Sequence, residues 1–106
     1  MKSTRFGAIA LLTAAAVPAA AAAPRTHVVV IDKMKFGAMP ASVRAGDRIL
    51  WVNKDLVRHT ATSRQAGFDV DLPASTKART QVRKAGAFRV VCPFHPGMVA
   101  SFKVKE

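Results

Sequence analysis

Hydrophobic and polar residues alternate along the C-terminal third of the chain and predict β-strands there. In residues 75–83 one face holds Thr76, Ala78, Thr80 and Val82, and the other holds Lys77, Arg79, Gln81 and Arg83. Residues 98–104 repeat the pattern, with Met98, Ala100, Phe102 and Val104 on one face. Because side chains in a strand point alternately to opposite faces, each segment is expected to bury one face and expose the other.

Further extended segments are predicted by runs of β-branched and aromatic residues. They are residues 25–31, 48–53, 59–62 and 87–91. Less regular structure is expected in residues 32–37 and 64–74. Residues 39–45 are expected to form a further extended piece. Residues 23–106 show no sustained helical periodicity. Short strands separated by frequent turn residues predict a single all-β domain, an antiparallel sandwich, over residues 23–106.

The first 22 residues follow a different pattern. Lys2 and Arg5 precede an apolar run over residues 6–17, and Pro18 and a series of alanines follow. This order is typical of a secretory signal peptide, which we expect to be cleaved after Ala22. A membrane anchor is the alternative, but the apolar run is short for a span and Pro18 interrupts it. The sequence therefore predicts export through the inner membrane to the periplasm.

The chain is strongly basic, with 17 lysines and arginines against 6 acidic residues. Nucleic-acid binding would explain such a charge but conflicts with export, so an acidic partner protein or an anionic membrane surface fits better. Arg58, Arg64 and a stripe of Lys77, Arg79 and Arg83 could dock an acidic partner. The alternative is that these residues form a solvated face with no partner.

Metal-binding side chains gather in residues 92–98, Cys-Pro-Phe-His-Pro-Gly-Met. Cys92 is the only cysteine, so an intramolecular disulfide is excluded and a lone thiol in an exported protein needs an explanation. Cys92, His95 and Met98 supply a thiolate, an imidazole and a thioether, a soft set that favours copper over calcium or magnesium. Each residue alone could be structural, but their combination favours a metal site.

Two histidines, a cysteine and a weak axial methionine are typical of electron-transfer copper centres. One imidazole is missing from residues 92–98, and His59 is the candidate because it follows a loop and begins an extended segment. His27 lies within the first predicted strand and is expected to be a strand or surface histidine.

Several motifs together resemble the small cupredoxins, the type I blue copper proteins, and in particular the amicyanin, pseudoazurin and plastocyanin group. The motifs are Gly46-Asp47, Trp51-Val52-Asn53, His59, Gly86-x-Phe88 and Cys92-x-x-His95-Pro96-x-Met98. The spacing between His95 and Met98 is the form found in amicyanin. The resemblance implies a Greek-key β-sandwich that holds one copper ion. It also implies His59, Cys92 and His95 as equatorial ligands, and Met98 as the weak axial ligand.

The same resemblance implies a function. It indicates a monomeric periplasmic carrier that cycles between Cu(I) and Cu(II) and passes single electrons between redox partners of the cytochrome or dehydrogenase class. A periplasmic carrier or resistance protein that buffers or delivers copper is the alternative, and it would use the same residues. An enzyme is not expected, because no acid–base pair is visible. Thr60 departs from the family, in which asparagine often follows the first ligand histidine and ties the ligand loops together.

Overall fold

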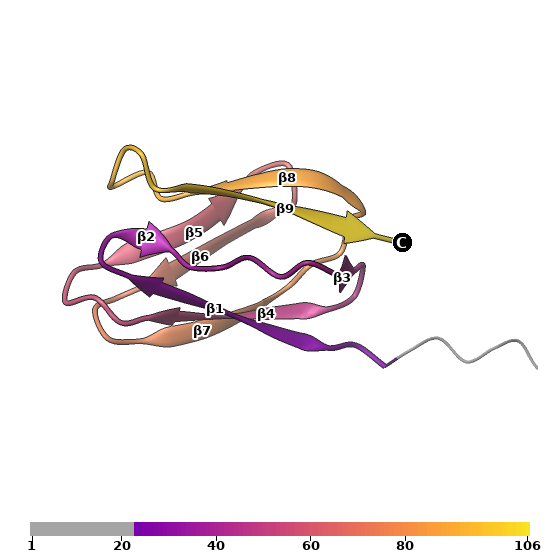
Figure 1. Cartoon of the computed structure of the whole chain (residues 1–106), viewed down its shortest axis with the longest axis horizontal. Coiled ribbons are helices and arrows are strands. Elements are labelled where there is room, and N and C mark those ends of the chain that lie inside the picture. The colour runs from indigo at the N-terminus through magenta and orange to yellow at the C-terminus, as the bar shows by residue number, and fades with distance from the viewer. Residues whose placement is uncertain (1–22) are drawn as a thin grey trace, which may run out of the picture.

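The computed structural model describes residues 23–106, which form nine β-strands in two sheets (Figure 1). The strands are β1 Thr26–Asp32, β2 Lys35–Phe36, β3 Val43–Arg44, β4 Arg48–Asn53, β5 His59–Ser63, β6 Phe68–Leu72, β7 Lys77–Gln81, β8 Gly86–Val91 and β9 Val99–Lys105. No helix in residues 23–106 is long and apolar enough to cross a membrane. The predicted signal peptide, residues 1–22, lies outside the described residues.

The two sheets pack face to face as a sandwich (Figure 1). One sheet has the strand order β2-β1-β4-β7 and the other has the order β3-β9-β8-β5-β6. The Greek-key β-sandwich expected from the sequence is therefore confirmed. The expectation of a purely antiparallel sandwich is wrong, because β1 pairs with β4 and β3 with β9 in parallel. The chain crosses to the second sheet as β3 before it returns as β4, which allows β4 to run in the same direction as β1.

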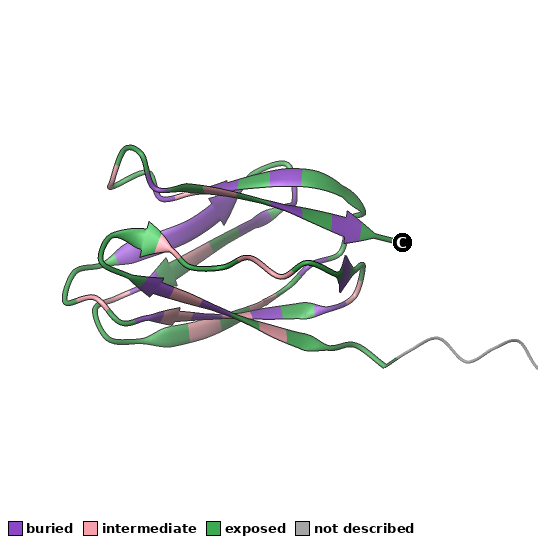
Figure 2. Cartoon of the chain, in the orientation of Figure 1, coloured by how far each residue is buried: buried purple, intermediate pink, exposed green. Residues whose placement is uncertain are grey.

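The core forms between the sheets, mainly from alternate residues of the longer strands, while β5 is buried along its whole length (Figure 2). In β4, Ile49 and Trp51 are fully buried, as the sequence pattern predicts. The Trp51 ring packs edge-on against Phe36, with 6.0 Å between ring centroids, and lies 5.9 Å from Phe68 in the opposite sheet. The Trp51–Phe68 contact joins the two sheets, whereas the Phe36–Trp51 contact lies within the four-stranded sheet.

Strand β6 lies within residues 64–74, where the sequence analysis expected irregular structure, so that expectation is wrong. Phe68 and Leu72 are buried, and the two aspartates between them are exposed. Apolar residues do alternate with polar ones in this segment. The polar residues are aspartates, however, and aspartate is depleted in strands, so the alternation did not indicate a strand. The aspartates are tolerated because β6 is an edge strand that pairs only with β5 and faces solvent on its outer side.

Candidate metal centre

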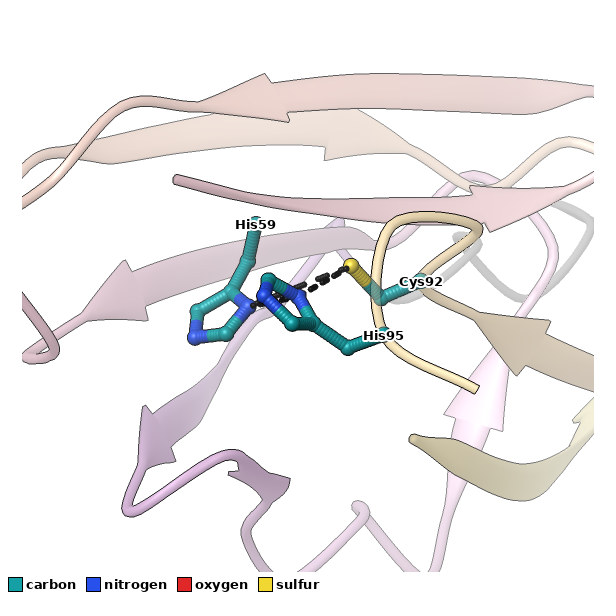
Figure 3. Close-up of side chains that lie close together, drawn as sticks. All are labelled: His59, Cys92 and His95. Carbon is teal, nitrogen blue, oxygen red and sulfur yellow. Dashed lines mark hydrogen bonds between the residues drawn. The ribbon is translucent and has the colours of Figure 1, made fainter. Parts of the chain in front are cut away.

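Three of the predicted ligands converge at one end of the sandwich (Figure 3). His59 is the first residue of β5, Cys92 directly follows β8, and His95 lies on the loop between β8 and β9. His59 is fully buried and Cys92 is 2% exposed, whereas His95 is only half-buried. The group therefore has two donors enclosed by the sheets and one that reaches toward the surface.

The donor atoms of this group lie within 4.8 Å of one another. The Nδ1 atoms of His59 and His95 are 3.1 Å apart, and the Cys92 Sγ lies 3.4 Å from His95 Nδ1 and 3.9 Å from His59 Nδ1. Metal–nitrogen bonds of about 2.0 Å and metal–sulfur bonds of about 2.3 Å around one ion put the ligand atoms roughly 3–4 Å apart. The spacing therefore fits a single metal ion, and a thiolate with two imidazoles fits copper.

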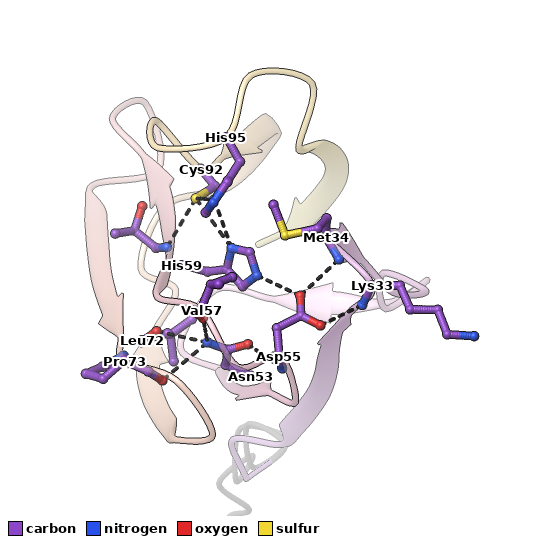
Figure 4. A network of polar contacts seen from close by, with 11 residues as sticks. Lys33, Met34, Asn53, Asp55, Val57, His59, Leu72, Pro73, Cys92 and His95 are labelled. Atoms are coloured by element: carbon purple, nitrogen blue, oxygen red, sulfur yellow. Dashed lines mark hydrogen bonds and ion pairs between the residues drawn. The ribbon is translucent and has the colours of Figure 1, made fainter.

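The Asp55 carboxylate orients the His59 ring from the side opposite Cys92 (Figure 4). Its Oδ2 lies 2.7 Å from His59 Nε2. Burial by itself would raise the pKa of Asp55, but hydrogen bonds from the Met34 amide, His59 and the Lys33 amide outweigh it and lower the pKa. Because an ionised carboxylate can only accept hydrogen bonds, Nε2 of His59 carries the proton. The lone pair of Nδ1 is then free to face the other donors.

The Asp55 carboxylate is itself held by a strained turn. Lys33 and Met34 form the two-residue connection between β1 and β2, and their φ angles are 53° and 62°. Positive φ at both positions is typical of the tight hairpin turns that match strand twist, but it is unfavourable for residues other than glycine. In this conformation both backbone amides donate to Asp55, at 2.8 and 2.9 Å. The β1–β2 hairpin thus helps to position His59.

Asn53, at the end of β4, organises the loop that carries Asp55. Its side-chain amide donates to the carbonyl oxygens of Val57, Leu72 and Pro73, at 2.9 to 3.2 Å. Its side-chain oxygen accepts a hydrogen bond from the Asp55 amide at 2.9 Å. The Asn53 side chain is buried, so these bonds fix the loop between β4 and β5 against the rest of the sandwich.

Thr60 ties β5 to the cysteine. Its backbone amide donates to the Cys92 Sγ at 3.4 Å, within the range for a hydrogen bond to sulfur. Its hydroxyl instead lies 3.0 Å from the Thr62 hydroxyl, which donates to Asp69. Thr60 therefore keeps the backbone part of the connection to Cys92, while its side chain bonds within the five-stranded sheet rather than to the ligand loop.

The loop from Cys92 to Met98 is closed on itself. The Cys92 amide donates to the Met98 carbonyl at 3.1 Å, and the amides of His95 and Met98 donate to the carbonyls of Cys92 and His95 at 3.0 Å each. Gly97 has a φ of 95°, a conformation that favours glycine. Met98, the fourth predicted ligand, is buried at the end of this loop and follows His95 closely in sequence.

The remaining histidine takes no part in this group. His27 lies on β1, as expected, and its Nε2 is 2.9 Å from the Asp47 carboxylate. Asp47 also accepts hydrogen bonds from the amides of Arg25 and Arg44. Asp47 precedes β4 and lies at the start of β1, whereas the Lys33–Met34 turn at the end of β1 faces the metal centre. The His27–Asp47 pair is therefore at the opposite end of the sandwich.

A family model described as a cupredoxin-like domain matches residues 5–102. The chain belongs to the cupredoxin-like family. Among curated proteins compared by sequence, none matches it significantly. Family, fold and donor set agree with a type I site for one copper ion.

Solved structures support the same fold. Amicyanin from Paracoccus versutus is 24% identical to this cupredoxin over 84% of this chain and 85% of its own, with a TM-score of 0.63. A mutant of amicyanin in the Cu(I) form is 23% identical over 76% of this chain and 82% of its own, with a TM-score of 0.65. A copper-containing nitrite reductase from Thermus scotoductus is 24% identical over 87% of this chain, but only 25% of its own, with a TM-score of 0.66.

The sequence analysis named His59, Cys92 and His95, which the structure brings together, but it did not single out Asp55. A carboxylate four residues before a candidate ligand was a visible signal. It was weak because Asp55 lies in a loop, where that spacing does not place two side chains on the same face. Only the fold shows that the loop turns back so that Asp55 meets the far nitrogen of His59.

Proposed function

We propose that this cupredoxin is a blue copper protein that carries single electrons. His59, Cys92 and His95 are the equatorial ligands in this proposal, and Met98 is the weak axial ligand. The observation that carries it is the convergence of two imidazole nitrogens and one thiol sulfur within 4.8 Å at a buried position. When bound, copper supplies the one-electron couple between Cu(I) and Cu(II).

The protein contributes a rigid and largely dry donor set. Asp55 keeps His59 in one orientation, the Thr60 amide contacts the Cys92 sulfur, and the closed loop fixes His95 relative to Cys92. Ligands that are held in place before and after electron transfer need little rearrangement, which suits rapid exchange of electrons.

The electron-entry surface in this proposal surrounds His95. Leu56 is 86% exposed and Phe94 is 60% exposed, and both flank the ligand residues in sequence. Exposed apolar side chains that gather into one patch are typical of a surface that contacts a partner. The partners are redox proteins, with the periplasm as the location. Residues 1–22 serve as the signal peptide, and residues 23–106 are the mature monomeric domain.

The optical spectrum of the copper-loaded protein, recorded before and after reduction, tests this function. A thiolate ligand should give the Cu(II) protein a strong visible band that disappears on reduction, and Cys92→Ser should abolish the band. Retention of the band in Cys92→Ser would show that the ligand assignment is wrong. Thr62→Ser, which leaves all four proposed ligands in place, is the matched control.

A copper carrier that delivers its ion is the competing function, with the same ligands. A reversible redox couple with fast self-exchange supports the electron carrier. Rapid loss of copper to a chelating acceptor supports the delivery protein. The burial of His59 and Cys92 favours the electron carrier, because exchangeable sites need exposed ligands.

A further inference from the structure

The outer face of the four-stranded sheet carries a block of apolar side chains. The parallel pairing of β1 with β4 places Val28 beside Leu50, and the next outward pair is Val30 beside Val52. The residues between them in each strand are buried in the core, so these four side chains point away from it. Val28 is 56% exposed, and the other three are partly exposed. Together they form one apolar block that faces solvent.

Basic side chains border this block on the side of β7. The antiparallel pairing of β4 with β7 places Arg79 beside Leu50, and the next outward pair is Lys77 beside Val52. Both basic residues are exposed, as is Arg48, which lies two residues before Leu50 on the same face. Within the part of the chain that the structure describes, none of these three cations forms an ion pair. The border of the block is therefore uncompensated positive charge.

Acidic side chains are scarce on this sheet. Asp32, at the end of β1, is the one carboxylate within the four strands of the described sheet, and it lies opposite Lys35 of β2. Two copies of the chain that packed through this face would bring their positive borders together, so charge disfavours a homodimer. A negatively charged surface that also accepts apolar side chains is the complementary partner.

An anionic lipid bilayer fits both parts of this face. Proteins that lie on bilayers combine buried apolar area with attraction to anionic head groups. The aliphatic stems of Lys77 and Arg79 can lie along the apolar block while their charged ends reach lipid phosphates. An acidic peptide would pair with the same cations but would leave the three valines and the leucine in water, so the bilayer is the better match.

This orientation leaves the metal centre accessible. His95 lies on the loop between β8 and β9, which belong to the other sheet. Figure 1 shows this loop on the far side of the sandwich from β4 and β7. A protein that rests on a bilayer through its four-stranded sheet can therefore still meet redox partners through the surface around His95.

We propose that the outer face of the four-stranded sheet is a membrane-binding surface that holds this protein reversibly on an anionic phospholipid bilayer. The apolar block enters the head-group region, and Arg48, Lys77 and Arg79 bind lipid phosphates. The attachment is peripheral, and no covalent bond forms or breaks. The inference goes beyond electron carriage, and none of the residues on this face is a proposed copper ligand.

Cosedimentation of the processed, copper-loaded protein with phospholipid vesicles measures the attachment. Vesicles of phosphatidylcholine mixed with phosphatidylglycerol should bind the protein, and vesicles of phosphatidylcholine alone should not. Lys77→Glu/Arg79→Glu should lower the partition coefficient by about 10-fold or more, since each basic residue near such a surface contributes about a factor of five. Equal binding to both kinds of vesicle, binding to neither, or unchanged binding of the double variant would overturn the proposal.

Arg89→Glu/Lys103→Glu is the matched control. It makes the same change in net charge at exposed positions on β8 and β9, in the other sheet. This variant should keep most of its binding to the anionic vesicles. Equal losses in the two double variants would show an effect of net charge alone and would also overturn the proposal.

Tryptophan fluorescence reports which face meets the lipid. Val28→Trp places an indole in the apolar block, and its emission should move to shorter wavelength when anionic vesicles are added to the reduced copper protein. Ala87→Trp, at an exposed position on β8, should show no such change. The buried Trp51 gives the same background in both variants. An unchanged emission at position 28, or equal shifts at the two positions, would contradict the proposed orientation.

An acidic protein is the competing occupant of this face. Saturable binding of polyglutamate that requires Lys77 and Arg79, together with no binding to vesicles, would replace the membrane surface by a protein-docking surface. The test is also separate from that of the metal site. An absent visible band or an irreversible copper couple would refute the electron carrier, and an absence of vesicle binding with a normal band and couple would refute only the membrane surface.

Discussion

At the scale of single residues, Asp55 decides which nitrogen of His59 faces the other donors. Its carboxylate accepts from the protonated Nε2 at 2.7 Å and is itself held by two backbone amides. A carboxylate in this position fixes the ring and makes the imidazole a better ligand. Asp55 is therefore a positioning residue for the proposed copper site.

We expect Asp55→Asn to weaken copper binding by about 10- to 100-fold, the usual effect of removing such a partner. Loss of a negative charge near the ion should also raise the reduction potential, because it favours Cu(I). Chelator competition and voltammetry measure the two effects. Asp69→Asn is the matched control, because Asp69 is bonded to Thr62 on the outer face of the sheet. Equal effects of the two substitutions would refute the role of Asp55.

Met98 is expected to adjust the site rather than hold it. A weak axial ligand tunes the potential of a type I centre, so Met98→Leu should keep the strong visible band and raise the potential. Leucine has a similar volume and preserves the packing of this buried side chain. Absorption spectra and voltammetry of the variant provide the measurement. Complete loss of colour would show that Met98 is essential to the site.

The sequence was most informative at this scale. The combination of Cys92, His95 and Met98 indicates a metal site, because sulfur and imidazole donors rarely gather within seven residues for another reason. Asp55 and Asn53 could not be recognised in the same way. Their roles depend on how the loop between β4 and β5 folds back, and carboxylates and amides are common in loops for other reasons.

At the scale of strands, Asp47 joins elements at the end of the sandwich far from the metal. It accepts from the amides of Arg25 before β1 and of Arg44 at the end of β3, and it contacts His27 on β1. Burial by itself would raise the pKa of Asp47, but the hydrogen bonds from Arg25, His27 and Arg44 outweigh it and lower the pKa to about 2. The ionised carboxylate thus stabilises the folded state.

The pH dependence of stability follows from this shift. Because the folded-state pKa is below the ordinary value of 3.8, the contribution is present above about pH 4 and is lost as the pH falls toward 2. We expect Asp47→Asn to lower the free energy of unfolding by about 2 kcal/mol at neutral pH, from a shift of nearly two pKa units.

Urea denaturation of both proteins between pH 7 and pH 2 measures this difference, which should shrink as the medium becomes acidic. Asp32→Asn, an exposed carboxylate on β1, is the control and should change little. A constant difference across this range would mean that the hydrogen-bonded charge of Asp47 is not its source.

The strands themselves were predicted well where apolar and polar residues alternate with basic side chains between them, as in β7 and β9. Strand β6 was missed because its outward residues are aspartates. The parallel pairs β1–β4 and β3–β9 were also missed. Local sequence patterns report which face of a strand is buried, but the direction in which distant strands pair is set by the path of the whole chain.

At the scale of the whole molecule, a small domain without a disulfide should gain stability from a ligand that binds only the folded state. At free copper a thousandfold above the dissociation constant, the gain is about 4 kcal/mol. Copper should therefore raise the melting temperature by several degrees, as measured by calorimetry with and without the ion. Cys92→Ser should lose most of this increase. An unchanged melting curve for the native sequence would exclude a tight site in the folded protein.

The pairing of β3 with β9 has a consequence for the order of assembly. Val43 lies opposite Val104, so β3 joins the five-stranded sheet only when β9 is in place. The loop from Cys92 to Met98 connects β8 to β9. Its C-terminal end is therefore fixed only when β9 pairs with the sheet. Contacts so distant in sequence form slowly. A nascent chain in which β9 has not yet paired should therefore expose the Cys92 thiol, and metal insertion should follow the pairing of β9 rather than guide it.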